Sequence, residues 1–185
     1  MRLAVPLVLA ALALSACGGA ERDQVAQGLP TAAAIVADPT AGTTAATGNT
    51  ALPDLQVVRV ASGKRAPLRS LAAPGKPTLL WFWAPHCTFC RAEAPDLLAF
   101  QKAYGDQVQI LGLGAQDDLD QAVDFLSDTG TQDLEMVWEQ AGKSWLHYQV
   151  TNQPTVVVLD ATGKVTKAWF RHFDADGILE AAGLA

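Results

Sequence analysis

Basic residues and cysteines are both scarce in this chain of 185 residues. It contains 13 lysines and arginines against 19 aspartates and glutamates, which gives a formal net charge of −6. The acidic residues are spread along the chain rather than gathered in a run. Because a protein that binds nucleic acid needs a basic face for the phosphates, the sequence excludes this class of partner.

The hydrophobic run at the start of the chain is too short for a membrane-spanning helix. Residues 3–14 follow the positive Arg2 and fall well short of the roughly 20 apolar residues that cross a bilayer. Small residues come next, as at a secretory cleavage site. We therefore predict that residues 1–17 form a signal peptide and lie outside the folded domain.

This signal ends on the tetrapeptide Leu14-Ser15-Ala16-Cys17, which resembles the lipobox of bacterial lipoproteins. The resemblance implies cleavage just before Cys17 and thioether lipidation of its sulfur. Each buried acyl methylene contributes about 0.8 kcal/mol, so two or three chains hold a protein firmly. We expect a lipid-anchored protein on the extracytoplasmic side of the bacterial membrane. The alternative is an ordinary signal peptide with a chance cysteine.

Large side chains and a hydrophobic period are missing from residues 18–51. The segment consists mainly of alanine, threonine, glycine and proline with scattered charges. Such a composition buries too little apolar surface to fold, so we predict a disordered linker. The folded domain is then expected at residues 52–185.

Apolar runs and turn signals within 52–185 predict alternating strands and helices. The expected strands are residues 56–60, 78–83, 107–112, 155–159 and 165–170. The expected helices are residues 87–104 with Pro95 inside, 119–126, 143–148, and a last helix to 182 capped by Asp174 or Asp176. This order of elements favours a mixed sheet covered on both faces.

Only two cysteines remain once Cys17 is assigned to lipid. Cys87 and Cys90 are three residues apart in an exported chain, where disulfides persist. A structural disulfide usually closes a longer loop, because loop-closure entropy grows with loop length. The pair is therefore better suited to exchange electrons than to staple the fold.

The ligands of a zinc site are incomplete in this sequence. A C-x-x-C pair also occurs in zinc sites, but zinc needs four ligands, usually from a second cysteine pair or two histidines. His86 adjoins the pair, whereas His147 and His172 have no matching spacing. We predict no metal and no cofactor.

The position of the two cysteines at a helix start assigns their roles. Residues at i and i+3 lie on one face of a helix, one turn apart. Cys87 is expected in the first turn, where free N–H groups and the positive helix end favour a thiolate. Cys87 is then the exposed nucleophile, and the better shielded Cys90 resolves the mixed disulfide.

Two motifs resemble those of the thioredoxin-fold proteins. WFWAPHCTFCRAEAP is similar to their active-site segment, including a proline five residues after the second cysteine, and NQPT resembles their cis-proline loop. A leading hairpin and an added helix near 119–126 are similar to the TlpA/ResA branch, and within it to the secreted DsbE-like disulfide-forming proteins of actinobacteria. The resemblance implies a thioredoxin α/β fold with a central mixed sheet, flanking helices, an N-terminal hairpin and an inserted helix.

The same resemblance implies a substrate-binding surface around the cysteines. Pro154 would follow a cis peptide bond and face Cys87, and the backbone of Gln153 would pair with an extended substrate segment. Pro85 and His86, just before Cys87, complete the predicted surface. The alternative for Pro154 is a trans proline that starts a strand.

Two residues near the cysteine pair depart from the common pattern, and a third could carry the proton that activates Cys90. His86 stands where many relatives have tryptophan; it is either an imidazolium that favours the Cys87 thiolate or a solvated histidine without influence. Trp81 stands where thioredoxin has a buried aspartate that shuttles protons. Glu93, one turn past Cys90, is a candidate substitute.

We read several other side chains as structural. The tryptophans are expected in core or rim packing, the aspartates at a helix start, and the basic residues on a solvated helix face: Trp138, Trp145 and Trp169; Asp117, Asp118 and Asp120; Arg91 and Lys102.

The functional prediction is an enzyme that oxidises the cysteines of exported proteins, with a redox partner in the membrane that regenerates the pair. The first alternative is a thiol–disulfide reductase, for example in cytochrome c maturation. A thiol peroxidase and a non-catalytic binding lipoprotein are further alternatives, because both can use this fold.

Overall fold

The computed structural model describes residues 52–185. The predicted signal peptide, the lipidation of Cys17 and the linker at 18–51 all lie outside the described residues. Within residues 52–185 no helix combines the length and the apolar character needed to cross a membrane.

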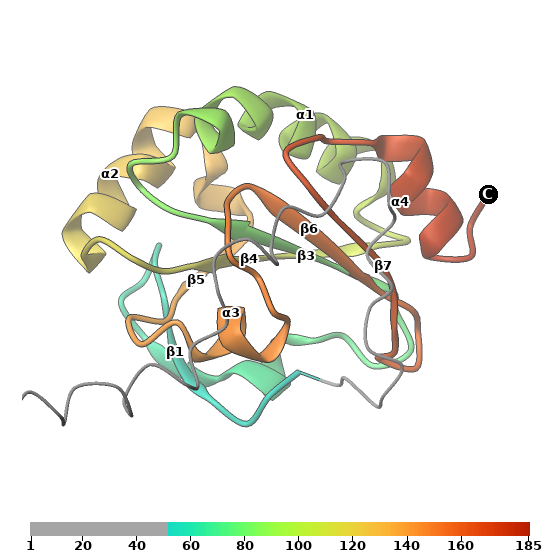
Figure 1. Ribbon diagram of the computed structural model, residues 1–185, viewed down its shortest axis with the longest axis horizontal. Coiled ribbons are helices and arrows are strands. Elements are labelled where there is room, and N and C mark those ends of the chain that lie inside the picture. The colour runs from blue at the N-terminus through green and yellow to red at the C-terminus, as the bar shows by residue number, and fades with distance from the viewer. Residues whose placement is uncertain (1–51) are drawn as a thin grey trace, which may run out of the picture. The chain divides into compact units, whose positions relative to one another are not determined.

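A seven-stranded mixed sheet forms the centre of the domain (Figure 1), in the order β2-β1-β5-β4-β3-β6-β7. The strands are β1 (Gln56–Arg59), β2 (Arg65–Pro67), β3 (Thr78–Trp83), β4 (Gln109–Gly114), β5 (Glu135–Trp138), β6 (Thr155–Leu159) and β7 (Val165–Phe170). β4 pairs in parallel with β3 and β5, whereas the other neighbours are antiparallel. The leading hairpin, β1 with β2, is present as the resemblance implied.

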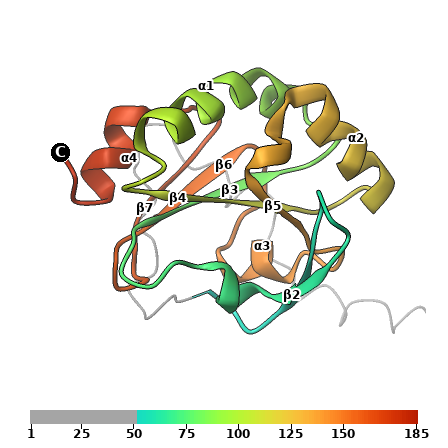
Figure 2. The ribbon, with the colours of Figure 1, turned by 180° about the vertical axis from the view of Figure 1, so that it is seen from behind.

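Helices cover both faces of this sheet, as predicted. The helices are α1 (Thr88–Tyr104), α2 (Leu119–Thr129), α3 (Lys143–His147) and α4 (Ala175–Ala181), with short 3-10 turns η2 (Leu68–Leu71) and η3 (Thr131–Asp133). Figures 1 and 2 show α1, α2 and α4 on one face and α3 on the other. Each face has its own cluster of buried apolar side chains.

The central strand β3 divides its side chains between the two clusters. All six of its residues are buried. Because successive strand residues point to opposite faces, Trp81 and Trp83 pack under the three helices and Phe82 packs on the α3 side. The burial of both faces explains why this stretch is a continuous apolar run.

Glycine in β4 makes room for the tryptophans of β3. Gly114 pairs with Trp83, whose ring stacks on Phe125 of α2 with centroids 4.5 Å apart. A Cβ on Gly114 would lie 2.7 Å from two atoms of the Trp83 ring. A bulky pair of aromatic rings therefore fits under α2 only because β4 presents bare backbone there.

Two strand predictions were wrong. Strand β5 was missed, since its four residues are too short for a clear period. The strand expected at 107–112 is β4, shifted to Gln109–Gly114. The reason is that the N–H groups of Gln107 and Val108 donate to the Tyr104 carbonyl in the turn that follows α1, so pairing begins later.

Candidate active site at the start of helix α1

A disulfide joins Cys87 and Cys90 where α1 begins. The Cα atoms are 5.3 Å apart and the sulfurs 2.09 Å. Cys87 is the N-cap of α1, and its Sγ accepts the N–H of Cys90 at 3.0 Å. When the bond is open, that N–H and the positive end of the 17-residue helix favour a Cys87 thiolate.

Cys87 is less exposed than expected. Cys90 is fully buried, in agreement with its predicted shielding, but Cys87 is only 5% exposed and does not form an open helix tip. The N–H of Cys87 donates to the Ala84 carbonyl at 3.0 Å, so the chain turns tightly before the helix and draws Cys87 against the end of the sheet. The accessible edge of the disulfide is therefore narrow, and Cys87 provides it.

The proline loop lies beside this disulfide. The Gln153–Pro154 peptide bond is cis, as the resemblance implied. The side-chain nitrogen of Gln153 lies 2.9 Å from Nε2 of His86, the residue before Cys87. Pro85 and Pro154 are buried, whereas His86 is exposed. His86 and Gln153 are therefore in contact, and each is the chain neighbour of one of the two prolines.

His86 contacts two loops. Its Nδ1 lies 2.6 Å from Oδ2 of Asp117, and its backbone N–H donates to the same oxygen at 3.0 Å. With the Gln153 amide nitrogen as donor, Nε2 of His86 accepts and Nδ1–H donates to Asp117. His86 is solvated, and it also links the turn before Cys87 to the proline loop.

The aspartates near α2 have different tasks. Asp118 caps α2 in a capping box with Gln121, and Asp120 lies in the first turn, as the helix-start interpretation predicted. Asp117 instead holds His86. No group of three possible metal ligands occurs among residues 52–185.

Glu93 lies on α1, three residues after Cys90. Nε1–H of Trp81 donates to Oε2 of Glu93 at 3.1 Å. Burial raises the pKa of Glu93 above its ordinary value, and the bond from Trp81 opposes this only in part. A carboxyl that holds its proton more tightly than usual therefore lies one turn from Cys90. Its hydrogen-bond donor, Trp81, stands where the resemblance places the buried aspartate of thioredoxin.

Arg91 also departs from the sequence interpretation. Its guanidinium donates to the Pro85 carbonyl at 3.2 Å and to Asp128 of α2 at 2.9 Å, and lies over the ring of Phe125. Lys102 is exposed, as expected. Arg91 is therefore not simply solvated; it ties the turn before Cys87 to α2.

Arg171 is a site residue that the sequence interpretation missed. Its guanidinium carbon lies 3.9 Å from the ring centroid of Phe89, which stands between the cysteines and is 47% exposed. The backbone N–H of Arg171 donates to the Pro154 carbonyl at 2.9 Å. The available signal was the hairpin register, since β6 begins directly after Pro154 and Thr155 pairs with Phe170.

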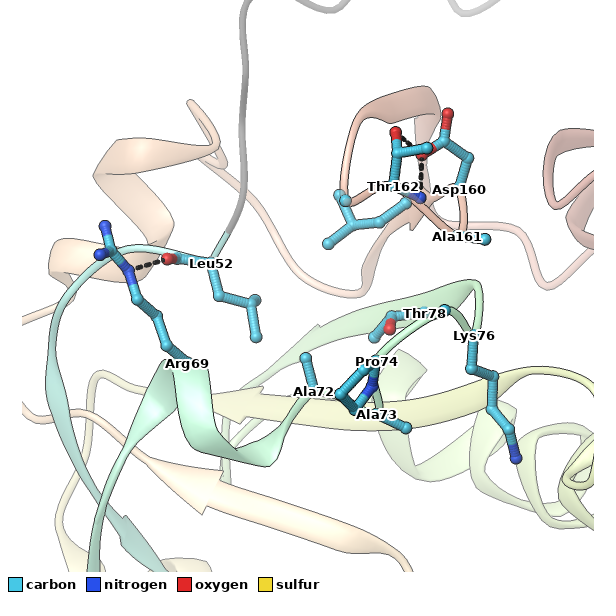
Figure 3. Close-up of a pocket in the computed structure, with 13 residues that line it drawn as sticks. Leu52, Arg69, Ala72, Ala73, Pro74, Lys76, Thr78, Asp160, Ala161 and Thr162 are labelled. Atoms are coloured by element: carbon cyan, nitrogen blue, oxygen red, sulfur yellow. Dashed lines mark hydrogen bonds between the residues drawn. The ribbon is translucent and has the colours of Figure 1, made fainter.

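A pocket of about 260 Å³ lies elsewhere (Figure 3). It is lined by residues at the start of β3 and around the β6–β7 turn, among them Thr78, Asp160 and Thr162. Because β3 runs from Thr78 toward the cysteines, this pocket lies at the opposite end of the strand. Its lining contains no cysteine or histidine, so this pocket is separate from the cysteine pair.

Residues 75–165 match the family model described as thioredoxin-like. The secreted antigen MPT53 of Mycobacterium tuberculosis is 34% identical over 101 residues, which are 55% of this chain and 57% of the antigen. The chain thus spans little more than half the length of that relative.

Two solved structures share the fold. A secreted disulfide oxidoreductase of M. tuberculosis, described as homologous to E. coli DsbE, has a TM-score of 0.59 and 28% identity, with 71% of this chain and 96% of that one covered. The exposed lipoprotein thioredoxin of Streptococcus pneumoniae has a TM-score of 0.61 and 26% identity, with 72% and 100% covered. With the mixed sheet, the C-x-x-C at the start of α1 and the family match, these likenesses show that the chain contains a thioredoxin-like domain.

Proposed function

We propose that this protein is a thiol–disulfide oxidoreductase that works outside the cytoplasm through Cys87 and Cys90. One observation carries the proposal: the disulfide lies at the start of α1, with the Cys90 N–H on the Cys87 sulfur and the proline loop beside it. When the bond is open, this arrangement favours a Cys87 thiolate, and an extended partner segment binds at the proline loop next to it.

The exchange takes two steps. A partner thiolate attacks Sγ of Cys87 along the S–S axis, a bond forms between them, and the Cys87–Cys90 bond breaks with Cys90 leaving as a thiolate. A second partner thiolate attacks the partner sulfur of this mixed disulfide and expels the Cys87 thiolate. The partner loses two electrons and gains a disulfide, and the pair gains the two electrons. The reverse sequence reduces a partner.

The substrate segment binds at the proline loop. Pro154 has no N–H, and it is preceded by Gln153, whose side-chain amide contacts His86. An extended chain that pairs with the Gln153 backbone passes the Cys87 sulfur and presents its own cysteine there. Pro85 and His86 border the opposite side of that path.

In this proposal Glu93 is the general acid and base for Cys90. Cys90 is fully buried, so its thiolate is costly until a proton reaches it. The raised pKa of Glu93, caused mainly by burial, keeps a proton available closer to neutral pH than an ordinary carboxyl would. Glu93 donates it when Cys90 leaves and accepts it when Cys90 attacks.

We favour oxidation of exported proteins as the direction. Groups that stabilise the reduced form make a disulfide more oxidising, as in the strongest known members of this class. The N-cap position of Cys87 and the Cys90 N–H are such groups. The likeness to a secreted disulfide oxidoreductase supports the location outside the cytoplasm.

Lipidation at Cys17 belongs to the same proposal. The tetrapeptide ending at Cys17 supports it, and a lipoprotein thioredoxin is among the similar structures. Residues 18–51 then act as a tether between lipid and domain. The intact mass of the membrane-fraction protein should carry acyl chains, and Cys17→Ala should release it; an unmodified membrane-fraction chain would contradict this.

The function is tested with the oxidised full chain and a reduced unfolded protein that has two cysteines. We expect disulfides to appear in the unfolded protein as the free thiols of Cys87 and Cys90 appear in equal amount. The equilibrium potential measured against glutathione should lie nearer about −120 mV than thioredoxin's roughly −270 mV. A potential near thioredoxin's, with no oxidation of the unfolded protein, favours the reductase instead.

A further inference from the structure

Arg171 presents a positive charge that has no ion pair among residues 52–185. His86 and Arg91, which also border the cysteines, are engaged with acidic partners: His86 with Asp117, and Arg91 with Asp128. The guanidinium of Arg171 lies over the rings of Phe89 and Phe170. Its charge is therefore available to a molecule that arrives at the site.

The backbone fixes Arg171 at the proline loop. Its N–H donates to the carbonyl of Pro154, the residue beside which a partner segment would bind. Its φ of 65° lies in the left-handed region, which is uncommon for arginine and costs free energy. The turn after β7 thus places the Arg171 side chain next to Phe89, at a position where a glycine would have less backbone strain.

The ring of Phe89 stacks against the guanidinium of Arg171. The guanidinium carbon stands 3.9 Å from the ring centroid, so the ring covers one face of the cation. The N–H groups at the edge of a stacked guanidinium stay free to bind a carboxylate with two parallel hydrogen bonds. Phe89 stands between the two cysteines in the sequence, which places such a carboxylate next to the reacting sulfur.

We propose that Arg171, resting on Phe89, is a specificity-determining residue that selects partner segments with a carboxylate close to the reacting cysteine. This inference rests on the proposed function and names its substrate class. The protein as a whole carries a net charge of −6 and repels acidic partners. Arg171 offsets this repulsion at one place, so that an acidic side chain is accepted only in register with the sulfur.

The test uses the oxidised full chain and three reduced peptides, each with two cysteines. The peptides differ at one position, two residues from the first cysteine, which holds Glu, Gln or Lys. The rate of disulfide formation in each peptide is measured by acid quench and mass spectrometry at low salt. We expect the order Glu, Gln, Lys, with a Glu-to-Gln ratio of about threefold to fivefold, as for an exposed charge pair.

Arg171→Gln should reduce the Glu-to-Gln ratio by that same factor. Comparing this ratio between variants cancels the effect of the glutamate on the peptide's own thiol. Arg65→Gln, an exposed arginine on β2 at the far edge of the sheet, is the matched control and should keep the wild-type ratio. An equal loss for all three peptides would mean that Arg171 acts on Cys87 itself, and would overturn the inference.

A salt series on the unmodified chain tests the same idea without a variant. The Glu-to-Gln ratio should fall as salt rises to about 0.5 M, because salt screens exposed charges. A ratio that is near one at low salt, or that ignores salt, overturns the role of Arg171 but not the exchange. If no peptide reacts at all, the proposed function itself fails.

Discussion

The two ends of the sheet differ in what they offer a partner. At the end where β3 meets α1, three loops are in contact. His86 contacts Gln153 and Asp117. The guanidinium of Arg171 lies over the ring of Phe89, and its backbone N–H donates to the Pro154 carbonyl. At the other end a pocket of about 260 Å³ is lined by the β6–β7 turn and the segment before β3. This pocket and the cysteine pair are therefore at opposite ends of β3.

This difference teaches that this pocket does not mark the site of the cysteine pair. Disulfide exchange needs a straight path to one sulfur and an edge to which a peptide can pair, rather than an enclosed space. The pocket residues serve the fold: Asp160 accepts the N–H and hydroxyl of Thr162 and so closes the hairpin turn. Variants at the two ends should therefore separate activity from stability.

The largest contrast is expected between Cys87→Ser and Arg69→Ala. Without the Cys87 sulfur no mixed disulfide forms, so oxidation of a reduced peptide should disappear. Arg69 borders the pocket and donates to the Leu52 carbonyl, so its loss should leave the exchange rate unchanged. A pocket variant that abolished exchange would break the comparison.

Gly114→Ala should destabilise the cysteine end by about 1–3 kcal/mol, the usual cost of overpacking a core. The new Cβ would meet the Trp83 ring at 2.7 Å and Trp138 at 3.0 Å. Chemical denaturation measures the change. The control is Gly63→Ala, whose Cβ has no neighbour within 4 Å and which should lose only about 1 kcal/mol to left-handed backbone strain.

Glu93→Gln should slow the exchange at least roughly tenfold, because the proton of Cys90 loses its carrier. Peptide oxidation followed from pH 5 to 8 should also lose the pH dependence that Glu93 contributes. An unchanged rate and profile would remove Glu93 from the proposed mechanism. Trp81 Nε1 still finds the amide oxygen as acceptor, so the packing of α1 is preserved.

The same variant makes a stability prediction. The pKa of Glu93 is raised in the folded chain, so the protonated carboxyl suits the fold better, and stability is lost as pH rises through the folded pKa. Glu93→Gln cannot ionise. It should therefore match the natural chain below about pH 4 and be the more stable of the two at pH 7, as denaturation midpoints at both pH values would show.

The smallest effect is expected at the pocket end. Asp160→Ala removes three hydrogen bonds of an exposed turn, from the N–H and hydroxyl of Thr162 and the N–H of Lys164. We expect a loss of about 0.5 kcal/mol at pH 7, with no change in exchange rate. The bond from Thr162 lowers the pKa of Asp160, so this difference should vanish as pH falls through the folded pKa.

The sequence predicted the parts of the fold that short-range patterns determine. The run at 78–83 is a buried strand, Cys87 starts the helix, and Asp118 and Asp120 lie at the start of the next one, because each depends on neighbouring residues. Strand β5 was missed because four residues between a 3-10 turn and a loop carry no period. The sheet order likewise depends on contacts between distant segments.

The candidate site divides in the same way. Cys87, Cys90 and Pro154 belong to contiguous motifs, so they were found from the sequence. Asp117 and Arg171 reach the site through folding: Asp117 is 31 residues from His86, and Arg171 follows a strand that pairs next to the proline loop. No local motif marks either residue.

Trapping the mixed disulfide tests the central claim most directly. In the full chain with Cys90→Ser, Cys87 has no resolving partner, so a disulfide-containing partner should stay attached to it after attack. Mass mapping of the trapped complex is predicted to show the partner cysteine on Cys87 and on no other cysteine. A partner attached through Cys17, or no adduct while Cys87→Ser with Cys90 intact forms one, would contradict the account.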